Sequence, residues 1–229
     1  TVPDDAPHVG LEPGEPVRHG RQLRVGHVQR VACAGRPRGA VVLLQEIFGL
    51  NTHVRHKADE WAAEGWLAVA PGLFDRVEPG LVLAYADIPR GMACLGAITE
   101  DMLLADLQAA IDFAAEAAPV SVIGWCWGGA VAYLAASKSS GVHRAVCYYG
   151  SRIAGFCERM TPQVPTMYHF GALDKSLPPE AIEKIRAHDP AGTFHVYPGV
   201  DHAFTNHERP PFDAAAAALT DSWKRDRAS

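Results

Sequence analysis

Apolar runs alternate with amphipathic stretches along most of the chain, and this alternation is typical of a mainly parallel sheet with flanking helices. The run Ala40–Leu44 is continuous and aliphatic, as expected for a strand that is buried on both faces. Similar runs predict further strands at residues 66–70, 120–123, 142–149, 166–170 and 193–197. Apolar residues at helical spacing predict helices at residues 53–64, 100–116, 128–138, 179–188 and 212–227.

Three segments are less regular. Residues 72–96 show no clean period, and we expect a long connection with room for a short helix. Residues 17–34 are expected to add an antiparallel strand or two at one edge of the sheet, and residues 1–16 to form an irregular extension. The whole pattern predicts one doubly wound, mainly parallel α/β domain over residues 1–229.

The composition excludes several classes of protein. Apolar residues make up 48% of the 229, enough for a large buried core, and the net charge of −5 provides no basic face for nucleic acid. No apolar run approaches the roughly 20 residues that a membrane span needs. Residues 1–20 are rich in Pro, Asp and Gly and do not resemble a secretory signal. We therefore expect a cytoplasmic protein without nucleic-acid or membrane partners.

The five cysteines do not form a recognisable disulfide or zinc pattern, because their number is odd and no C-x-x-C pair occurs. Cys147 lies in an apolar strand and is expected to be a small buried residue, as are Cys33, Cys94 and Cys157. His53 and His56 begin a predicted helix but lack a third ligand, so no metal site is expected.

Cys126 has different surroundings, because it lies in a G-x-nucleophile-x-G pattern between a predicted strand and a predicted helix. Such a turn is so tight that the residues two before and two after the nucleophile must be small, and these are Gly124 and Gly128. The helix N-terminus favours a thiolate, and the N–H of Trp127 could stabilise an oxyanion. The alternative is a glycine-rich turn with a buried cysteine.

Chain order favours the catalytic interpretation. In hydrolases with this turn the acid and then a histidine follow the nucleophile. Asp174 and His202 both come directly after predicted strands, so both would lie at the carboxyl edge of the sheet, where open α/β sheets place their sites. A capping aspartate and a surface histidine are the alternatives. Three signals in this order predict a Cys126–His202–Asp174 triad on an α/β-hydrolase fold.

From about Val41 to Phe204 the chain resembles the dienelactone hydrolase family. The motifs that carry the resemblance are Gln45–Asn51, Ala70–Phe74, Gly124–Gly129, Tyr149–Gly150, Gly171–Asp174 and Gly199–Phe204. The resemblance implies a cysteine hydrolase of cyclic enol-lactones or related esters that needs no cofactor. It also implies that Glu46 lies against the thiol and that the N–H of Ile47 is the second oxyanion donor.

A carboxylate at the end of a buried strand is costly unless it is paired. Beside Cys126, a negative Glu46 would oppose the thiolate and hold the resting enzyme protonated until substrate draws the carboxylate away. The alternative is a Glu46 side chain in solvent. Trp125 and Trp127 flank the nucleophile and are expected to line the pocket, together with Phe48 and Tyr85.

The chain departs from the family pattern at Asn206, where the family has an arginine that helps to hold the substrate carboxylate. An amide can bind a carboxylate but provides no charge-assisted fork. The family's other anion-binding arginine precedes the helix at residues 100–116, and Arg90 or Arg76 could take its place. The reaction type is unaffected, but dienelactone itself does not follow as the substrate.

The sequence therefore predicts a two-step acyl transfer through a thioester on a small-molecule lactone or ester. A broader carboxylesterase or thioesterase with the same triad is the first alternative. A thiol sensor or binding module that retains the fold is the second, although no resolving cysteine lies nearby in the sequence. We expect a monomer or weak homodimer.

Overall fold

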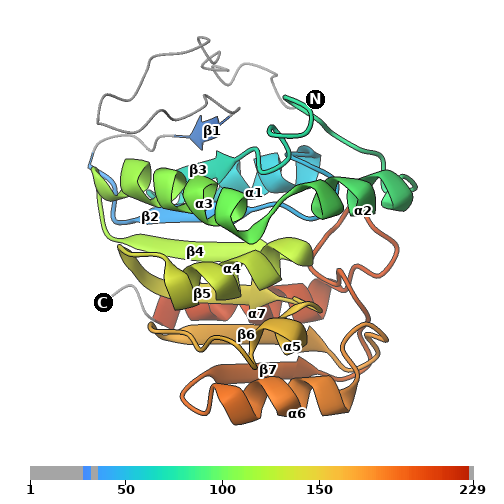
Figure 1. Ribbon diagram of the computed structural model, residues 1–229. Coiled ribbons are helices and arrows are strands. Elements are labelled where there is room, and N and C mark those ends of the chain that lie inside the picture. The colour runs from blue at the N-terminus through green and yellow to red at the C-terminus, as the bar shows by residue number, and fades with distance from the viewer. Residues whose placement is uncertain (1–27, 32–35, 227–229) are drawn as a thin grey trace, which may run out of the picture.

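The computed structural model describes residues 28–31 and 36–226, in which seven strands form one sheet (Figure 1). The strand order is β1-β3-β2-β4-β5-β6-β7, and all neighbouring pairs are parallel except β1 with β3. The strands are β1 (Val28–Val31), β2 (Ala40–Leu44), β3 (Leu67–Pro71), β4 (Val120–Trp125), β5 (Val142–Tyr148), β6 (Thr166–Gly171) and β7 (Thr193–Tyr197). The predicted mainly parallel α/β fold is thus confirmed.

Helices cover both faces of this sheet. Figure 1 shows α3, α4 and α5 in front of the strands and α1 and α7 behind them. No helix in the described part of the chain is both long and apolar enough to cross a membrane. The helices are α1 (Thr52–Ala63), α2 (Ile88–Ala97), α3 (Glu100–Ala115), α4 (Trp127–Lys138), α5 (Ile153–Phe156), α6 (Pro179–His188) and α7 (Ala214–Asp226).

The winding of the chain reverses between β2 and β4. These strands are neighbours, yet β3 lies on the far side of β2 and β5 lies on the far side of β4. Such a reversal sends the connections after the two strands to opposite faces and leaves a crevice at their carboxyl ends. The residues that follow Leu44 and Trp125 therefore come together at the position where α/β folds bind their ligands.

Most predicted elements match the structure to within two residues, and β2 is fully buried as expected. The main difference is α2, which occupies a segment predicted to be largely irregular. Pro89 stands in the first turn of α2, where a missing N–H costs nothing, and the helix buries Gly91 and Cys94. A Cβ on Gly91 would lie 2.5 Å from the Ile47 carbonyl oxygen, so α2 packs directly on the chain after β2.

The N-terminal predictions are only partly covered. β1 lies within the predicted edge segment at residues 17–34 and pairs antiparallel with β3, as expected. The rest of that segment, Cys33 and the extension at residues 1–16 lie outside the described residues. A single domain over the whole chain, a cytoplasmic location and a monomer or weak homodimer stay predictions.

His53 on α1 is a buried histidine whose ring nitrogens have no hydrogen-bond partner among the described residues. Its ring meets Trp125 edge-on at 5.6 Å between centroids. Burial, aided by the nearby Lys57, lowers the pKa of His53 to about 3. The folded protein therefore holds this imidazole neutral, whereas the unfolded chain protonates it near pH 6.5.

Because the unfolded state binds more protons between about pH 6.5 and 3, His53 makes the free energy of unfolding fall as the pH drops through this window. Between pH 6.5 and 5, we expect the free energy of unfolding of His53→Phe to fall by about 2 kcal/mol less than that of wild type. Urea unfolding at the two pH values measures the difference. The exposed His143→Gln is the control, and an equal fall in wild type and His53→Phe would contradict the prediction.

Candidate active site

Cys126 occupies the turn between β4 and α4. Its backbone has φ 56° and ψ −119°, a left-handed conformation that L-residues rarely adopt. The turn is held because the Cys126 N–H donates to the Tyr148 carbonyl at 3.0 Å and the Cys126 carbonyl accepts from Gly129 N–H at 3.0 Å. Strain of this kind persists where the surrounding structure imposes it, and it presents the half-buried sulfur at the N-terminus of α4.

The two glycines of the turn leave no room for a side chain. A Cβ on Gly124 would lie 1.9 Å from the Gly128 carbonyl oxygen, and one on Gly128 would lie 2.2 Å from the Leu44 carbonyl oxygen. Both are backbone atoms, which cannot move aside. The prediction that small residues are needed on both sides of Cys126 is thus confirmed.

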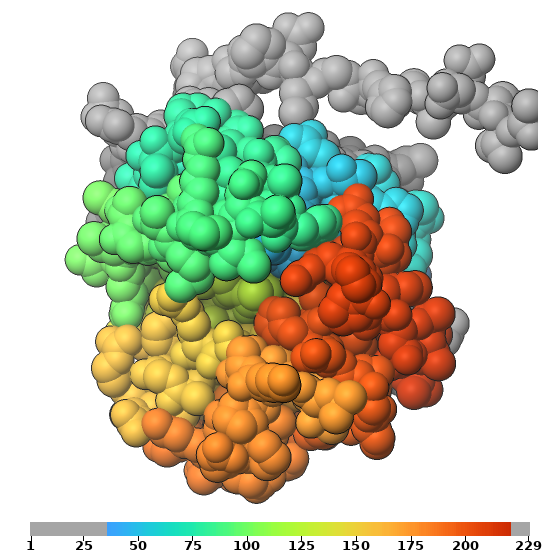
Figure 2. Space-filling model, turned by 90° about the vertical axis from the view of Figure 1, so that its right-hand side faces the viewer, coloured from blue at the N-terminus to red at the C-terminus, as the bar shows by residue number. Residues whose placement is uncertain are grey.

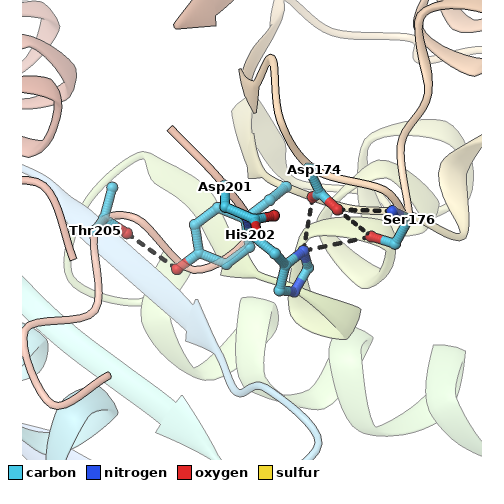
Figure 3. A network of polar contacts seen from close by, with 6 residues as sticks. Asp174, Ser176, Asp201, His202 and Thr205 are labelled. Atoms are coloured by element: carbon cyan, nitrogen blue, oxygen red, sulfur yellow. Dashed lines mark hydrogen bonds and ion pairs between the residues drawn. The ribbon is translucent and has the colours of Figure 1, made fainter. Parts of the chain in front are cut away.

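Asp174 and His202 come from the loops after β6 and β7 and meet beside this turn (Figure 3). The Nδ1 atom of His202 lies 2.7 Å from Oδ2 of Asp174, whose side chain is 1% exposed. Cys126 is close enough to His202 to raise the pKa of the imidazole. The structure therefore brings together the three residues that the sequence predicted as a triad.

The charges of these groups support one another. Burial alone would lower the pKa of His202, but hydrogen bonds with Asp174 and Cys126 outweigh it and raise the pKa to about 10. Burial would likewise raise the pKa of Asp174, yet the hydrogen bonds from His202 and Ser176 hold it below its usual value. The arrangement favours an ionised carboxylate next to an imidazole that binds a proton readily.

Tyr149, which follows β5, packs against the imidazole of His202. Its ring meets that of His202 edge-on at 4.9 Å between centroids, and its hydroxyl is 3.0 Å from Oγ1 of Thr205, a contact drawn in Figure 3. Tyr149 itself has φ 38°, a second strained residue at this edge of the sheet. The ring therefore limits how far His202 can turn.

Glu46 follows β2 and is fully buried, which rules out a side chain in solvent. Its Oε2 atom accepts a hydrogen bond from Nδ2 of Asn206 at 3.0 Å, and its Oε1 atom has no partner among the described residues. Burial raises the pKa of Glu46, although Arg209, His202 and the Asn206 hydrogen bond partly offset the rise. A buried carboxylate held by one neutral donor is easily protonated.

A hollow lies over these residues. Figure 2 looks onto the carboxyl ends of the strands, where the green chain around α2 and the red chain after β7 stand on either side of a recess. Yellow-green chain, the colour of β4 and the start of α4, lies at its floor. A substrate that reached Cys126 would pass between these two segments.

Comparisons with known proteins agree with this geometry. The sequence model of the dienelactone hydrolase family matches residues 29–227. The chain belongs to the dienelactone hydrolase family. The carboxymethylenebutenolidase of Pseudomonas putida is 31% identical over 205 residues, which cover 84% of this chain and 86% of the relative.

Solved structures agree as well. A crystal structure named "Putative Dienelactone Hydrolase" from Klebsiella pneumoniae subsp. pneumoniae is 26% identical, with a TM-score of 0.71 over 87% of this chain and 97% of that chain. Esterase 2 of Thermogutta terrifontis shares the fold at 16% identity, with a TM-score of 0.59 over 86% and 87% of the two chains. As a member of this family, the protein is a carboxylic ester hydrolase.

In this member of the dienelactone hydrolase family, both polar atoms of the Asn206 side chain form hydrogen bonds with neighbouring residues. The Nδ2 atom donates to Oε2 of Glu46 at 3.0 Å and to the Tyr85 hydroxyl at 3.1 Å. The Oδ1 atom accepts from the Glu208 N–H at 3.0 Å. Asn206 is also fully buried. The amide therefore holds Glu46 in place, and a contact between Asn206 and substrate stays a prediction.

Tyr85 joins the same network rather than offering a free hydroxyl. The hydroxyl accepts from Asn51 and Asn206 at 3.1 Å each and donates to Glu208 at 2.6 Å. The ring meets Phe48 edge-on at 4.9 Å between centroids. Tyr85 thus connects α1, the segment before α2 and the loop after β7.

The two arginines considered for a substrate carboxylate are both paired on the surface. Arg76 forms two hydrogen bonds of 2.7 Å with Asp106, and Arg90 pairs with Glu78. These carboxylates occupy the guanidinium groups. Their role in substrate binding stays a prediction, with a competing partner now identified for each.

Arg209 and Ser176 were not singled out from the sequence. The Arg209 guanidinium lies 5.8 Å from the Phe48 ring centre and 5.5 Å from that of Tyr85, and it lowers the pKa of Glu46. Arg209 follows Asn206 by three residues, and this short separation is the sequence signal that could have identified Arg209. For Ser176, the Asp-x-Ser spacing typical of a side-chain turn is the corresponding signal.

The tryptophans beside Cys126 are largely buried. Trp125 stacks on Tyr148 at 5.7 Å between centroids, and Trp127 stacks on Phe74 at 5.3 Å. Trp125 lines a small internal cavity beneath the sheet with residues of α1 and α7. Its substrate contact stays a prediction, and its packing places the ring behind the turn. Among the described residues, no cluster of His, Cys, Asp or Glu could hold a metal ion.

Proposed function

We propose that the protein hydrolyses enol-lactones or related esters through a thioester on Cys126. The observation that carries this proposal is the strained residue at φ 56°, whose thiol acts on the pKa of His202, while Oδ2 of Asp174 lies 2.7 Å from Nδ1 of the same ring. A strained turn that exposes a thiol to a buried base is built for nucleophilic attack.

The first half of the reaction forms the thioester. His202 takes the proton of Cys126 on Nε2, because its Nδ1 faces Asp174. The thiolate then attacks the carbonyl carbon, and the carbonyl oxygen becomes an oxyanion. When the C–O bond of the ester breaks, His202 returns its proton to the leaving enolate or alkoxide.

The second half releases the acid. His202 takes a proton from water, and the resulting hydroxide attacks the thioester carbonyl. The C–S bond breaks, the carboxylic acid product leaves and loses its proton to solvent, and the thiolate of Cys126 regains the proton from His202. Thiolates open activated esters well and amides poorly, so a peptidase is disfavoured.

Two backbone N–H groups are assigned to the oxyanion, those of Trp127 and Ile47. Trp127 is the first residue of α4, where an N–H has no acceptor within the helix. Ile47 follows β2, one residue after Glu46, at the same edge of the sheet. Within the described part of the chain, neither N–H has another backbone acceptor. Two such donors can stabilise a tetrahedral intermediate by several kcal/mol.

Glu46 is assigned the role of a guard on the thiol. While ionised, a carboxylate beside Cys126 raises the cost of forming the thiolate. Because burial raises the pKa of Glu46, the guard weakens as the pH falls and the carboxyl takes up a proton. Asn206 holds this carboxyl, so a substrate that disturbs the network of Asn206 and Tyr85 would also move Glu46.

The charge of Arg209 supports one substrate class. Arg209 lies over the rings of Phe48 and Tyr85, and no carboxylate of the described residues forms an ion pair with it. We assign to it the negatively charged substituent of a lactone. A broader esterase or thioesterase with the same triad is the second candidate, since Asn206 contributes no charge of its own.

A panel of carboxylated enol-lactones and neutral aryl esters separates the two candidates. We expect Arg209→Gln to lower kcat/KM for the carboxylated lactone about 10- to 100-fold, the value of a lost charge-assisted hydrogen bond of about 1.5–3 kcal/mol. Neutral esters should change little. Arg186→Gln is the matched control, because Arg186 stacks on Phe194 at 4.4 Å on a different part of the molecule. A loss confined to Arg90→Gln would contradict the assignment.

A further inference from the structure

Ser176 donates two hydrogen bonds to one oxygen of Asp174. Its N–H lies 2.9 Å and its Oγ lies 2.6 Å from Oδ1, in the loop between β6 and α6 (Figure 3). The other oxygen, Oδ2, accepts from His202 Nδ1 at 2.7 Å. Among the described residues, two of the three hydrogen bonds that this carboxylate accepts therefore come from Ser176, and the side chain of Asp174 is 1% exposed.

A carboxylate removed from water needs such donors to stay ionised. They also fix its direction, since Oδ1 is held by two bonds from the same residue and Oδ2 is then turned toward the imidazole. Short hydrogen bonds between a hydroxyl and a carboxylate are among the stronger ones in proteins. Ser176 thus acts on both the charge and the orientation of Asp174.

The hydroxyl of Ser176 also touches the histidine. Its Oγ lies 3.4 Å from Nδ1 of His202. Because the single hydroxyl proton is directed to Asp174, Oγ presents a lone pair to Nδ1, and the only compatible arrangement has the proton on Nδ1. In the neutral ring this leaves Nε2 without a proton, as an acceptor for the thiol of Cys126.

We propose that Ser176 is a positioning residue that keeps Asp174 ionised and holds His202 in the Nδ1–H tautomer. The proposal rests on the function proposed above, in which His202 is the base. Ser176 contacts neither sulfur nor substrate and acts through Asp174 and His202. It extends the triad to a fourth side chain.

Other titratable groups also face the pair. Cys126, in the turn before α4, raises the pKa of His202, and Glu46, after β2, interacts with His202 through its charge. The Tyr149 ring packs on the imidazole from the end of β5. Asp201 accepts the backbone N–H of His202 at 2.6 Å. These contacts are the same with or without the Ser176 hydroxyl, so a change in that hydroxyl isolates its own effect.

Ser176→Ala is a sharp test because it keeps the backbone N–H bond that shapes the loop and removes only Oγ. We expect kcat to fall about tenfold at neutral pH with KM nearly unchanged, since the orientation of the base is lost and substrate contacts are not. The acid limb of kcat/KM against pH reports protonation of the base His202, and it should move to lower pH because a less firmly ionised Asp174 supports protonated His202 less. Ser176→Thr, which restores a hydroxyl, should recover most of the rate.

Nitrogen NMR of the His202 ring provides a readout that does not depend on turnover. We expect the proton on Nδ1 in wild type and a lower imidazole pKa in Ser176→Ala. Ser137→Ala, which removes a hydroxyl bonded to the Tyr133 carbonyl within α4, controls for a general loss of stability. An acid limb and an NMR titration that both stay at their wild-type positions in Ser176→Ala would overturn the proposal. Failure of the proposed function would show separately, because turnover would then survive in Cys126→Ala.

Discussion

Replacing Cys126 by alanine is expected to lower kcat/KM for any ester substrate about 10³–10⁴-fold. The variant keeps the turn, both oxyanion donors and His202, but it has no atom that can form the acyl-enzyme. Binding and oxyanion stabilisation can still leave some rate above that of water. Steady-state kinetics on an aryl ester measures the loss, and unchanged thermal unfolding shows that the fold is intact.

Cys147→Ala is the matched control for this experiment. Cys147 is fully buried in β5 and pairs with Gly124 across the sheet, so its loss removes a second thiol close to the turn without touching the base. It should leave kcat/KM near the wild-type value. Equal losses in the two variants would point to damage of the core, and full activity in Cys126→Ala would exclude this residue as the nucleophile.

Asp174→Asn is expected to lower kcat about 10²–10⁴-fold with a smaller change in KM. The negative charge that supports protonated His202 is lost. An amide can also direct its N–H groups at Nδ1, and the imidazole then carries its proton on Nε2 and cannot accept that of Cys126. The pH dependence should change too, because the carboxylate no longer contributes to the raised pKa of His202.

Asp189→Asn separates this effect from the cost of altering a buried acid. Asp189 is buried and accepts a 2.6 Å hydrogen bond from the Tyr168 hydroxyl, at the end of α6. We expect it to lower the melting temperature while kcat stays near that of wild type. A kcat in Asp174→Asn within a few-fold of wild type would mean that His202 is oriented by other groups.

The sequence was informative wherever a single chain segment determines the structure. The continuous apolar run Ala40–Leu44 predicted a buried strand, and two glycines spaced around Cys126 predicted a turn without room for side chains. The order of Cys126, Asp174 and His202 predicted their meeting, because consecutive parallel strands deliver their ends to one edge.

The sequence was less informative wherever segments far apart pair with each other. Arg76 meets Asp106 across 30 residues, and Asn206 meets Glu46 across 160, and neither pairing leaves a local pattern. Arg209 is recognisable as a site cation only once the loop after β7 folds over Phe48 and Tyr85. The bond from Ser176 to Asp174 could have been predicted, because the Asp-x-Ser spacing is local, but the contact of Ser176 with His202 depends on a second loop.

Asn206 therefore changes how Glu46 is held. An amide that donates to Glu46 and Tyr85 fixes the carboxyl without neutralising it, and the charge of Arg209 lowers the pKa of Glu46. Positioning and charge compensation, which one arginine could combine, are divided between two residues. On the role proposed for Glu46, a substrate would act on this carboxyl through its charge at Arg209 or through its shape at Tyr85.

Trapping the acyl-enzyme tests the central claim most directly. The protein is mixed with a slowly hydrolysed activated ester, quenched in acid within the first turnover and digested for mass spectrometry. We predict an added acyl mass on the peptide that contains Cys126, released by neutral hydroxylamine as expected for a thioester and absent from Cys126→Ala. An acyl group on a different residue, or the same adduct in Cys126→Ala, would contradict the account.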